Sequence, residues 1–247
     1  MKLRFKKAID AVRNLEKDAR YFGAFIFGSV ARGEAGDASD LDVKVLVDNG
    51  NCENINHPFI HGVKLDITFL SLGQLEEVQE RIVKKGERIP MLAESVILFD
   101  KTGGLTELKK KYQKIRPKKY AKKEYNLAQF GVFHADDKIK RAFEKNDFRS
   151  TELGMHMNLG EILKVYYRIK GRWWVSDKRL FADLELWDTK LAKLLELYLL
   201  ESNIQHKYQV WTKMIEHILK PIGGRKGIRE INCNCESCKR DLARLVK

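Results

Sequence analysis

The stretch from Phe25 to Val47, FIFGSVARGEAGDASDLDVKVLV, decides the fold. An apolar run breaks at a Gly-Ser pair, crosses a small polar loop and continues as a second apolar run that begins with Asp40 and Asp42. Because alternate side chains of a strand share a face, both carboxylates point the same way, while Leu41 and Val43 point into the core. Their Cβ atoms lie roughly 6 to 7 Å apart in a strand. This spacing suits two carboxylates that hold a pair of divalent ions.

A second alternating run, VKLDITFL at residues 63–70, carries a third carboxylate, Asp66. Its apolar residues point inward, and Asp66 points outward. If this strand lies beside the one that carries Asp40 and Asp42, three carboxylates converge on one open face of the sheet. Unpaired carboxylates repel one another, and a pair of metal ions removes that repulsion. The alternative interpretation is that Asp40 and Asp42 are loop and cap residues, since Asp is common where strands begin.

The Gly-Ser pair suits phosphate binding. Gly28 lets the backbone approach a ligand closely, and Ser29 opens a short helix whose first N–H groups and hydroxyl face phosphate oxygens. Arg32 adds a charge-assisted contact to a triphosphate. A Gly-Ser pair alone says little, but its place between a buried strand and the Asp-x-Asp strand makes the pattern specific.

Helical and strand-like patterns interleave over about the first hundred residues, which predicts an α/β unit. Past residue 124 no strand-like alternation of any length is left, and long helical patterns predict a separate all-helical bundle. We therefore expect domains at 1–104 and 125–221, joined by a basic linker or helix at 105–124 and followed by a basic tail at 222–247. The expected strands are 21–27, 41–47, 63–70 and 94–100, and the expected helices are 3–19, 71–85, 125–145, 151–170, 188–201 and 204–219.

The segments GSVARGEAGDASDLDVKVLV and KLDITFL resemble the core of the DNA polymerase beta-like nucleotidyltransferase superfamily. Its signature is a Gly-Ser pair, then Asp-x-Asp after a short loop, then a later strand Asp. The resemblance implies an α/β (α+β) fold with a small mixed sheet. It also implies transfer of a nucleoside monophosphate from an NTP, with ATP expected, to an acceptor hydroxyl with release of pyrophosphate.

By the same resemblance, Asp40 and Asp42 bind two Mg²⁺ ions, and Asp66 binds the ion that activates the acceptor hydroxyl and takes its proton. Phosphoryl transfer depends on in-line positioning and charge neutralisation more than on covalent chemistry, so these roles agree with the residue types. The expected nucleotide-binding residues are Gly28, Ser29, Arg32, Ser39 and Lys178.

A catalytic unit followed by a helical domain also resembles the antibiotic nucleotidyltransferases of the kanamycin type, whose helical domain binds the acceptor and whose active site lies between the two domains. Glu152 and His156 share one helix face and are candidates for the acceptor side. A solvated Glu beside a helical His is the alternative for both residues. Lys178 is a candidate for the triphosphate, unless Ser176 and Asp177 simply cap a helix that begins there.

The formal net charge is +13, with 47 basic and 34 acidic residues, and it points to polyanionic partners such as nucleotides or RNA. Residues 109–123 are dominated by Lys and Arg without an acid, which indicates either a solvated helix face or a track for a phosphate backbone. The sequence carries no apolar stretch of membrane-spanning length and no signal peptide, so a cytoplasmic protein is expected.

Three clustered cysteines, Cys233, Cys235 and Cys238, are candidate Zn²⁺ ligands, although a structural zinc site needs a fourth ligand and reduced cysteines without metal are the alternative. The expected function is therefore a Mg²⁺-dependent nucleotidyltransferase whose acceptor is a small molecule such as an aminoglycoside-like antibiotic. Two alternatives remain open. One is an RNA- or protein-modifying nucleotidyltransferase of toxin–antitoxin type, and the other is a non-catalytic nucleic-acid binder that retains the fold.

Overall fold

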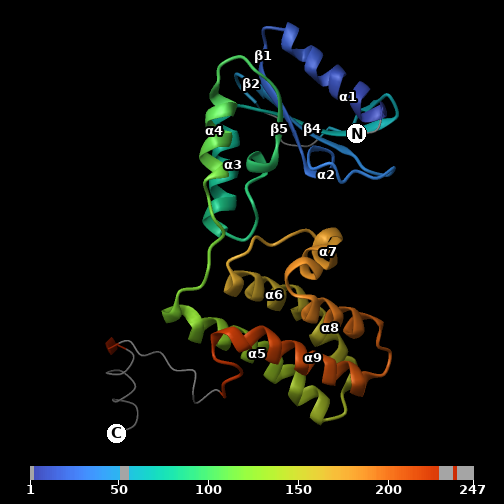
Figure 1. The fold of residues 1–247 in the computed structure, drawn as a ribbon, viewed down its shortest axis with the longest axis vertical. Coiled ribbons are helices and arrows are strands. Elements are labelled where there is room, and N and C mark those ends of the chain that lie inside the picture. Colours follow the sequence, from blue (N-terminus) through green and yellow to red (C-terminus); the bar gives the residue numbers. More distant parts are fainter. Residues whose placement is uncertain (1–2, 51–55, 228–235, 238–247) are drawn as a thin grey trace. The chain divides into compact units, whose positions relative to one another are not determined.

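A computed structural model describes residues 3–50, 56–227 and 236–237 (Figure 1). The chain forms two compact units, Met1–Pro117 and Lys118–Lys247. The first unit extends beyond the expected limit at residue 104, because helix α4 (Gly104–Gln113) buries Leu105, Leu108 and Tyr112 against the rest of that unit. Part of the segment 105–124, which was expected to be a basic linker or helix, is thus a packed helix.

The first unit is built on a mixed five-stranded sheet with the order β3-β4-β2-β1-β5, which confirms the expected fold class. Strands β2 and β4 run parallel, whereas β1 is antiparallel to both β2 and β5, and the short β3 is antiparallel to β4. The strands span β1 Tyr21–Phe27, β2 Leu41–Val47, β3 Phe59–Ile60, β4 Val63–Leu70 and β5 Val96–Asp100.

Helices cover both faces of this sheet (Figure 1). On one face, α1 (Leu3–Arg13) packs with the strand residues that were expected to point inward, among them Leu41, Val43 and Leu65. On the other face, α3 (Leu72–Lys85) and α4 pack over Leu46 and Leu70. The face that carries the three Asp residues was expected to be open. It is instead covered by α3 and α4 further along the strands, because alternation gives that face its own apolar residues beyond the acids.

Helix α3 begins with the expected Ser cap. The Ser71 hydroxyl accepts a hydrogen bond from the Gln74 N–H at 3.2 Å, and the Gln74 side chain accepts one from the Ser71 N–H at 2.8 Å. Its C-terminal end is closed by Gly86 in the left-handed conformation. Three short helices complete the unit: η1 Asn14–Lys17, α2 Gly28–Ala31 and η2 Met91–Glu94.

The second unit is helical throughout its described residues, as expected. Its core holds the fully buried side chains of Tyr166, Tyr167, Tyr198 and Trp211. Three of these four aromatic groups have hydrogen-bond partners for their polar ends: the Tyr166 hydroxyl donates to Asp188, the Tyr167 hydroxyl to Asp183 at 2.6 Å and the Trp211 indole N–H to the buried Asp136 carboxylate at 3.0 Å. The buried Tyr198 hydroxyl has no hydrogen-bond partner among the described residues. The helices are η3 Lys122–Glu124, α5 Tyr125–Glu144, α6 Phe148–Lys170, α7 Asp177–Trp187, α8 Thr189–Leu200, α9 Ile204–Leu219 and η4 Lys220–Ile222.

Among the helices in the described ranges, none combines the length and apolar character that crossing a lipid bilayer requires.

The core of the second unit gives a stability prediction. Leu195 is 1% exposed, whereas Leu200 of the same helix is 77% exposed. Leu195→Ala is expected to destabilise this unit by about 2–5 kcal/mol through lost burial and a cavity, and Leu200→Ala by less than about 0.5 kcal/mol. All four tryptophans lie in the second unit, so urea unfolding followed by tryptophan fluorescence measures both effects there. Equal shifts would contradict the described packing of α8.

Candidate functional site

The site begins where β1 ends and α2 starts. Gly28 has φ 72°, a backbone conformation that other residues rarely adopt. A Cβ at this position would lie 2.0 Å from Oδ2 of Asp42, because Phe27 and Asp42 are direct partners on the antiparallel strands β1 and β2. Glycine is therefore required twice, by the turn and by the carboxylate that lies against its backbone.

The three acidic residues come from the neighbouring strands β2 and β4, as the sequence indicated. Asp42 and Asp66 are direct partners in the parallel register, and Asp40 immediately precedes β2. Their strand neighbours of opposite parity, such as Leu41 and Leu65, are buried under α1. The carboxylates therefore share the opposite face of the sheet.

Of the three acids, Asp42 has the surroundings that least favour the charged form of its carboxyl group. Burial raises the pKa of its carboxyl, and the nearby charges of Asp66 and Asp40 raise it further, against the opposing effect of Lys44 and Arg32. Within the described residues, no hydrogen bond or salt bridge reaches the Asp42 side chain. Its charge is thus partly desolvated and repelled by two neighbouring carboxylates, a combination that a bound cation would relieve.

The side chains of Lys64 and His57 contact the other two acids. Neither residue was assigned to this site from the sequence. The Lys64 ammonium bridges Asp40 at 3.0 Å and Asp66 at 3.2 Å. Nδ1 of His57 lies 2.6 Å from Oδ1 of Asp66. Burial alone would raise the pKa of Asp66, but the hydrogen bonds from His57 and Lys64 outweigh it and lower that pKa.

The signal for Lys64 was available in the sequence. Lys64 lies two residues before Asp66 on the same strand, so the two side chains share a face. The parallel register places Leu41 opposite Leu65, and therefore brings Asp40 level with Lys64. His57 belongs to the loop before β3 and gives no comparable signal, because its approach to Asp66 depends on how that loop folds.

The three carboxylates fit a divalent metal by their chemistry, since Mg²⁺ prefers hard oxygen ligands. In the present arrangement, however, no group of three His, Cys, Asp or Glu side chains in the described ranges is gathered to hold a metal ion. In this arrangement the Lys64 ammonium is paired with two of the three carboxylates, those of Asp40 and Asp66. Metal binding by all three acids requires that this ammonium move away.

The loop between α2 and β2 has a defined structure. The Ser39 hydroxyl accepts a hydrogen bond from the Gly36 N–H at 2.9 Å, and the Ser39 N–H donates to the Gly36 carbonyl at 3.3 Å. Arg4 of α1 donates to the carbonyls of Gly36 and Asp37. Ser39 thus closes the turn that leads into Asp40. Its hydroxyl positions this segment of the chain instead of contacting a ligand.

Of the remaining nucleotide-binding candidates in the first unit, Ser29 lies in the first turn of α2, directly after Gly28. Arg32, at the end of the same helix, has its guanidinium engaged by two acids: Nε lies 2.9 Å from Glu34 and Nη1 lies 3.6 Å from Glu94. To bind a triphosphate, Arg32 would have to exchange these partners for phosphate oxygens.

Lys178, Glu152 and His156 belong to the second unit. Lys178 is exposed in the first turn of α7, a helix that begins at Asp177 as the alternative interpretation expected. The Glu152 carboxylate accepts a hydrogen bond at 2.9 Å from the ammonium of Lys207, which is only 7% exposed, and this bond lowers the pKa of Glu152. Nδ1 of His156 lies 2.9 Å from the Glu152 carbonyl oxygen. Glu152 is therefore a poor proton acceptor in this arrangement.

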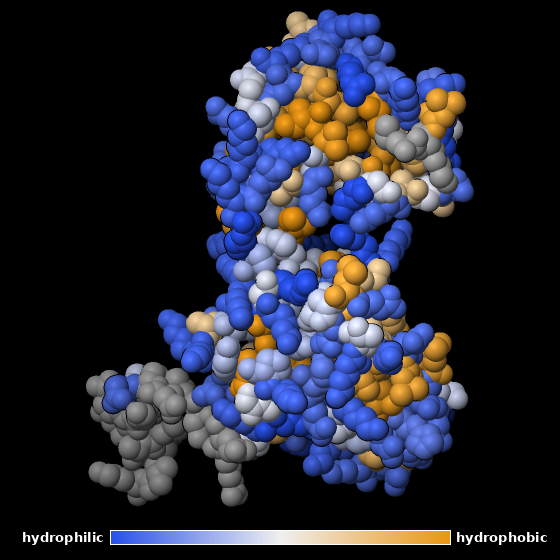
Figure 2. Space-filling view, in the orientation of Figure 1, coloured by the Kyte–Doolittle hydropathy of each residue, from blue (hydrophilic) through white to orange (hydrophobic). Residues whose placement is uncertain are grey.

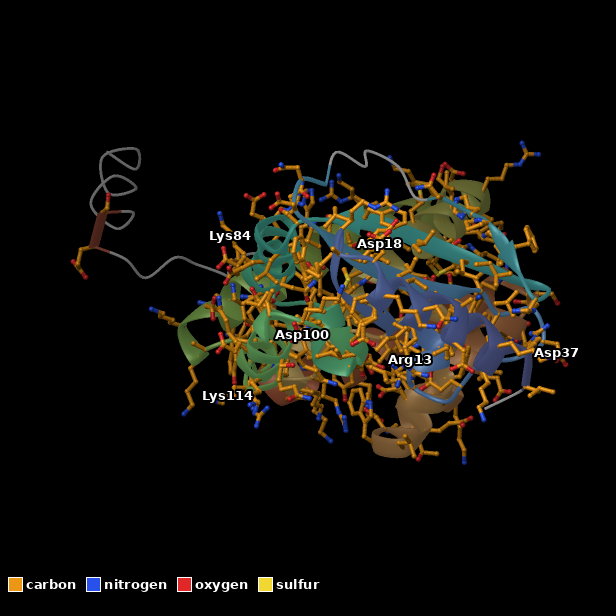
Figure 3. All side chains as sticks on the ribbon, turned by 90° about the horizontal axis from the view of Figure 1, so that it is seen from above. Arg13, Asp18, Asp37, Lys84, Asp100 and Lys114 are labelled. Carbon is orange, nitrogen blue, oxygen red and sulfur yellow. The ribbon has the colours of Figure 1, made fainter. Side chains whose placement is uncertain are left out.

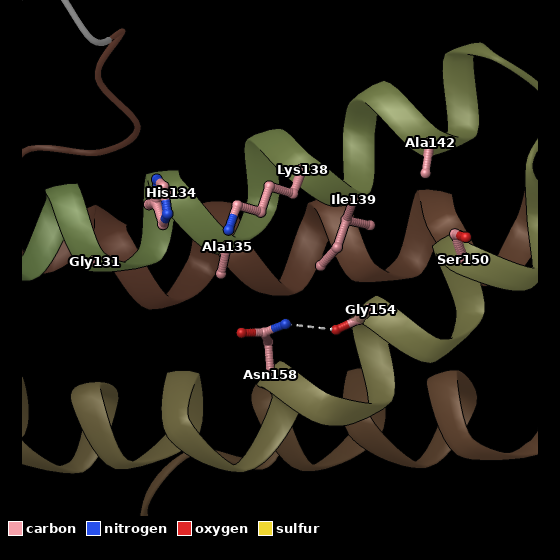
Figure 4. Close-up of a pocket in the computed structure, with 9 residues that line it drawn as sticks. All are labelled: Gly131, His134, Ala135, Lys138, Ile139, Ala142, Ser150, Gly154 and Asn158. Atoms are coloured by element: carbon pink, nitrogen blue, oxygen red, sulfur yellow. Dashed lines mark hydrogen bonds between the residues drawn. The ribbon is translucent and has the colours of Figure 1, made fainter.

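A groove of about 390 Å³ lies between α5 and α6 of the second unit (Figure 4). Small residues form much of its floor, and the polar side chains of His134, Lys138 and Asn158 lie around it. The Asn158 amide N–H donates back to the Gly154 carbonyl at 2.8 Å, so part of its capacity is used within its own helix. The lining residues are Gly131, His134, Ala135, Lys138, Ile139, Ala142, Ser150, Gly154 and Asn158.

The candidate zinc ligands Cys233, Cys235 and Cys238 lie outside the described residues.

Residues 12–92, which contain the Gly-Ser turn and all three acids, match the family model described as polymerase beta, nucleotidyltransferase. This segment is a nucleotidyltransferase domain of the polymerase beta type. No curated protein matches the chain. A solved structure, the nucleotidyltransferase-like protein from Exiguobacterium sibiricum 255-15, is similar to it at 16% sequence identity and a TM-score of 0.49, over 87% of this chain and 74% of that one.

The contact between Gly28 and Asp42 of this nucleotidyltransferase domain predicts unequal effects of two glycine substitutions. Gly33 also has a positive φ, 78°, but nothing lies within 4 Å of a Cβ there. Gly33→Ala is expected to cost about 1–2 kcal/mol of backbone strain. Gly28→Ala adds a clash with the Asp42 carboxylate, so it should cost clearly more and displace that side chain. Hydrogen exchange of peptides that cover β1 and β2 measures both, and equal losses of protection would contradict the close approach.

Proposed function

We propose that this chain is a Mg²⁺-dependent nucleotidyltransferase that uses an NTP, with ATP as the expected donor. An acceptor hydroxyl oxygen forms a bond to the α-phosphorus, the bond from that phosphorus to the bridging oxygen breaks, and pyrophosphate leaves. The observation that carries the proposal is the arrangement of Asp42, which lies against Gly28, faces Asp66 directly across two parallel strands and has no partner among the described residues.

In this proposal Asp40, Asp42 and Asp66 hold two Mg²⁺ ions, which when bound neutralise the charge that develops on the phosphate oxygens. Asp66 would take the proton of the acceptor hydroxyl after Lys64 and His57, whose hydrogen bonds lower its pKa in the present arrangement, have moved away. The Ser29 hydroxyl and the Arg32 guanidinium hold the triphosphate, with Gly28 allowing the backbone to approach it. Ser39 acts indirectly, by closing the turn that sets the position of Asp40.

The acceptor of the proposed reaction carries a hydroxyl, and a small molecule such as an aminoglycoside-like antibiotic is one candidate. For that acceptor, the side chains of Glu152 and His156 in the second unit are the proposed contacts. Because Glu152 is paired with Lys207 and its pKa is lowered, it would serve as a charged hydrogen-bond acceptor for a cationic or hydroxyl-bearing ligand and not as a proton acceptor.

A second candidate function, a non-catalytic nucleic-acid binder that retains the fold, is favoured by one observation. Lys64 neutralises Asp40 and Asp66 without any metal ion, so two of the acids are satisfied in a protein that never binds one. Asp42 argues against this function, because a binder of polyanions gains nothing from a half-buried carboxylate that two neighbouring carboxylates repel.

The reaction itself gives the first test. Purified protein is incubated with each NTP and a mixture of acceptors, and pyrophosphate release is measured with and without Mg²⁺. Asp42→Asn is expected to lower the rate by roughly 100-fold or more, in the range seen when an electrostatic contribution to the transition state is removed. Asp48→Asn serves as the matched control, since Asp48 is an exposed residue just after β2. Metal-independent release that is equal in all variants would end the proposal.

The bridging lysine gives a second test that does not depend on turnover. Lys64→Met removes the ammonium that occupies Asp40 and Asp66, so the metal-free protein is expected to lose stability and to gain more from added Mn²⁺. The measurement is the rise in melting temperature on adding Mn²⁺, which should be larger for Lys64→Met than for the wild type. Lys64→Arg retains the bridge and should behave like the wild type. Absence of any Mn²⁺ effect in all three proteins would favour the non-catalytic function.

A further inference from the structure

Large apolar side chains that face solvent are concentrated in the second unit. Among the described residues eight of the eleven belong to it, and the other three lie on separate elements of the first unit, at Leu3, Phe59 and Val96. Exposed charged side chains, such as those of Asp37 and Lys114, lie at opposite sides of the first unit when it is seen from above (Figure 3). A surface that another protein covers is therefore expected on the second unit.

The eight side chains lie on two pairs of helices. Figure 2 shows apolar side chains gathered where α8 ends, and the group on α7 and α8 comprises Leu186, Leu197, Leu199 and Leu200. The group on α5 and α6 comprises Leu127, Phe130, Leu153 and Met157. In this second group, Phe130, Leu153 and Met157 each directly precede a residue that lines the groove between α5 and α6 (Figure 4). Apolar side chains thus project beside a hollow on the same face.

The register of α5 and α6 shows which residues lie level with one another. The helices run antiparallel, since only residues 145–147 join them and they pack along their length. Gly154 meets Ile139, because a Cβ on Gly154 would come within 2.9 Å of the Ile139 side chain. Met157 lies three residues past this contact on α6, and Ala135, which lines the groove, lies four residues from it in the same direction on α5. The Met157 side chain, 72% exposed, therefore projects beside the middle of the groove.

A second copy of the chain matches this surface in shape. A two-fold axis parallel to the helices turns the face over but keeps every residue at its own level, so that α6 of one copy lies over α5 of the other. Met157 of each copy then enters the groove of the other at its middle. The groove has room there because much of its lining is small, namely Gly131, Ala135, Ala142, Ser150 and Gly154. The projecting side chain and the hollow are therefore complementary within one face.

The charges at the margins of this face also match in a two-fold pair. Glu144 and Arg149 are both exposed, and each lies five residues from the Ile139–Gly154 contact, so they are level with each other. Each is about half a helical turn away from a groove residue of its own helix, so it lies on the outer side. The axis brings these outer sides together, and Arg149 of each copy meets Glu144 of the other. The present partner of Glu144, Lys140 at 3.6 Å, is an exposed pair that contributes little.

Lys138, inside the groove, has a matching acid as well. Its side chain extends along the groove toward Ala135 (Figure 4), and a covering copy would take its ammonium out of water. Glu161 of the covering copy lies in that same direction, seven residues past Gly154 on α6. Within its own chain Glu161 has only an exposed pair with Lys164, at 2.5 Å. The second copy thus supplies an acid for the lysine that it covers.

We propose that the outer face of α5 and α6 is the interface of a homodimer, in which Met157 of each copy fills the groove of the other. A second copy is favoured over a different partner because one face carries both the projecting side chain and its hollow. It is favoured over a uniformly acidic or basic ligand because the face presents charges of both signs at positions that the axis pairs. Assembly of this kind does not depend on nucleotidyl transfer.

Sedimentation velocity of the full chain at micromolar concentrations tests this interface. The wild type is expected to sediment as a dimer, with twice the chain mass of 28.7 kDa. Leu153→Glu/Met157→Glu introduces four carboxylates into the interface and should raise the Kd of the dimer roughly 100-fold or more. Both side chains are exposed in the single chain, so the circular dichroism spectrum should not change. As the matched control, Leu197→Glu/Leu200→Glu places the same charges on exposed leucines of α8 and should leave the Kd within about twofold of the wild type.

A charge reversal tests how the two copies are oriented. Glu144→Arg and Arg149→Glu should each raise the Kd roughly tenfold, because each places like charges side by side twice. Glu144→Arg/Arg149→Glu restores opposite charges and should return the Kd to within about threefold of the wild type, which a loss of folding could not do. A monomeric wild type, which would leave the groove to a different partner, would overturn the proposal. Equal dissociation of the α8 control, or a double reversal no tighter than the single ones, would overturn it too.

Discussion

The candidate site of the first unit depends on one electrostatic constraint, the placement of Asp42 directly across from Asp66 on two parallel strands, with the Asp42 carboxylate against the backbone of Gly28. Two acids in register repel each other, and burial of one adds a desolvation cost. Neither carboxylate belongs to an apolar cluster, because their strand neighbours Leu41, Val43 and Leu65 pack on the other face and the apolar residues of their own face lie further along the strands. A cation at the site would relieve both of these costs, and the proposed function requires one there.

Lys64 supplies such a cation from the chain itself. Its ammonium lies between Asp40 and Asp66. The hydrogen bond to Asp40 raises the pKa of this ammonium most, and the hydrogen bond to Asp66 raises it further. Asp42 remains outside this bridge. Under the proposed function, the site would have two electrostatically balanced arrangements, the one described here with the lysine between two acids and one with metal ions among all three. The affinity for metal would then depend on the difference in free energy between these two arrangements, and not on the carboxylates alone.

Much of this could be predicted from the sequence, because the deciding features are local. Alternation along β2 and β4 fixes which side chains share a face, and the Gly-Ser turn lies directly before them, so the three acids and Gly28 were found together. The features that depend on packing between distant segments could not be predicted in this way. The cover formed by α3 and α4 and the approach of His57 to Asp66 depend on tertiary contacts, and the Lys64 bridge needed the parallel register as well as the strand pattern.

The second unit illustrates the same limit. Its helices follow from their periodicity, but the partner of Glu152 is Lys207, which lies on a different helix and 55 positions away. Sequence spacing on α6 alone placed Glu152 and His156 on one helix face, as candidates for the acceptor side. The structure gives Glu152 a nearly buried cationic partner instead, which changes the chemistry that this carboxylate can perform.

The most direct measurement is a crystal structure of the full chain with Mn²⁺ and a non-hydrolysable NTP analogue, recorded with anomalous scattering. Mn²⁺ peaks are expected among the carboxylates of Asp40, Asp42 and Asp66, with the Lys64 ammonium withdrawn from both of its present partners. Nucleotide bound elsewhere, or Lys64 still bridging Asp40 and Asp66 with no Mn²⁺ beside Asp42, would contradict it.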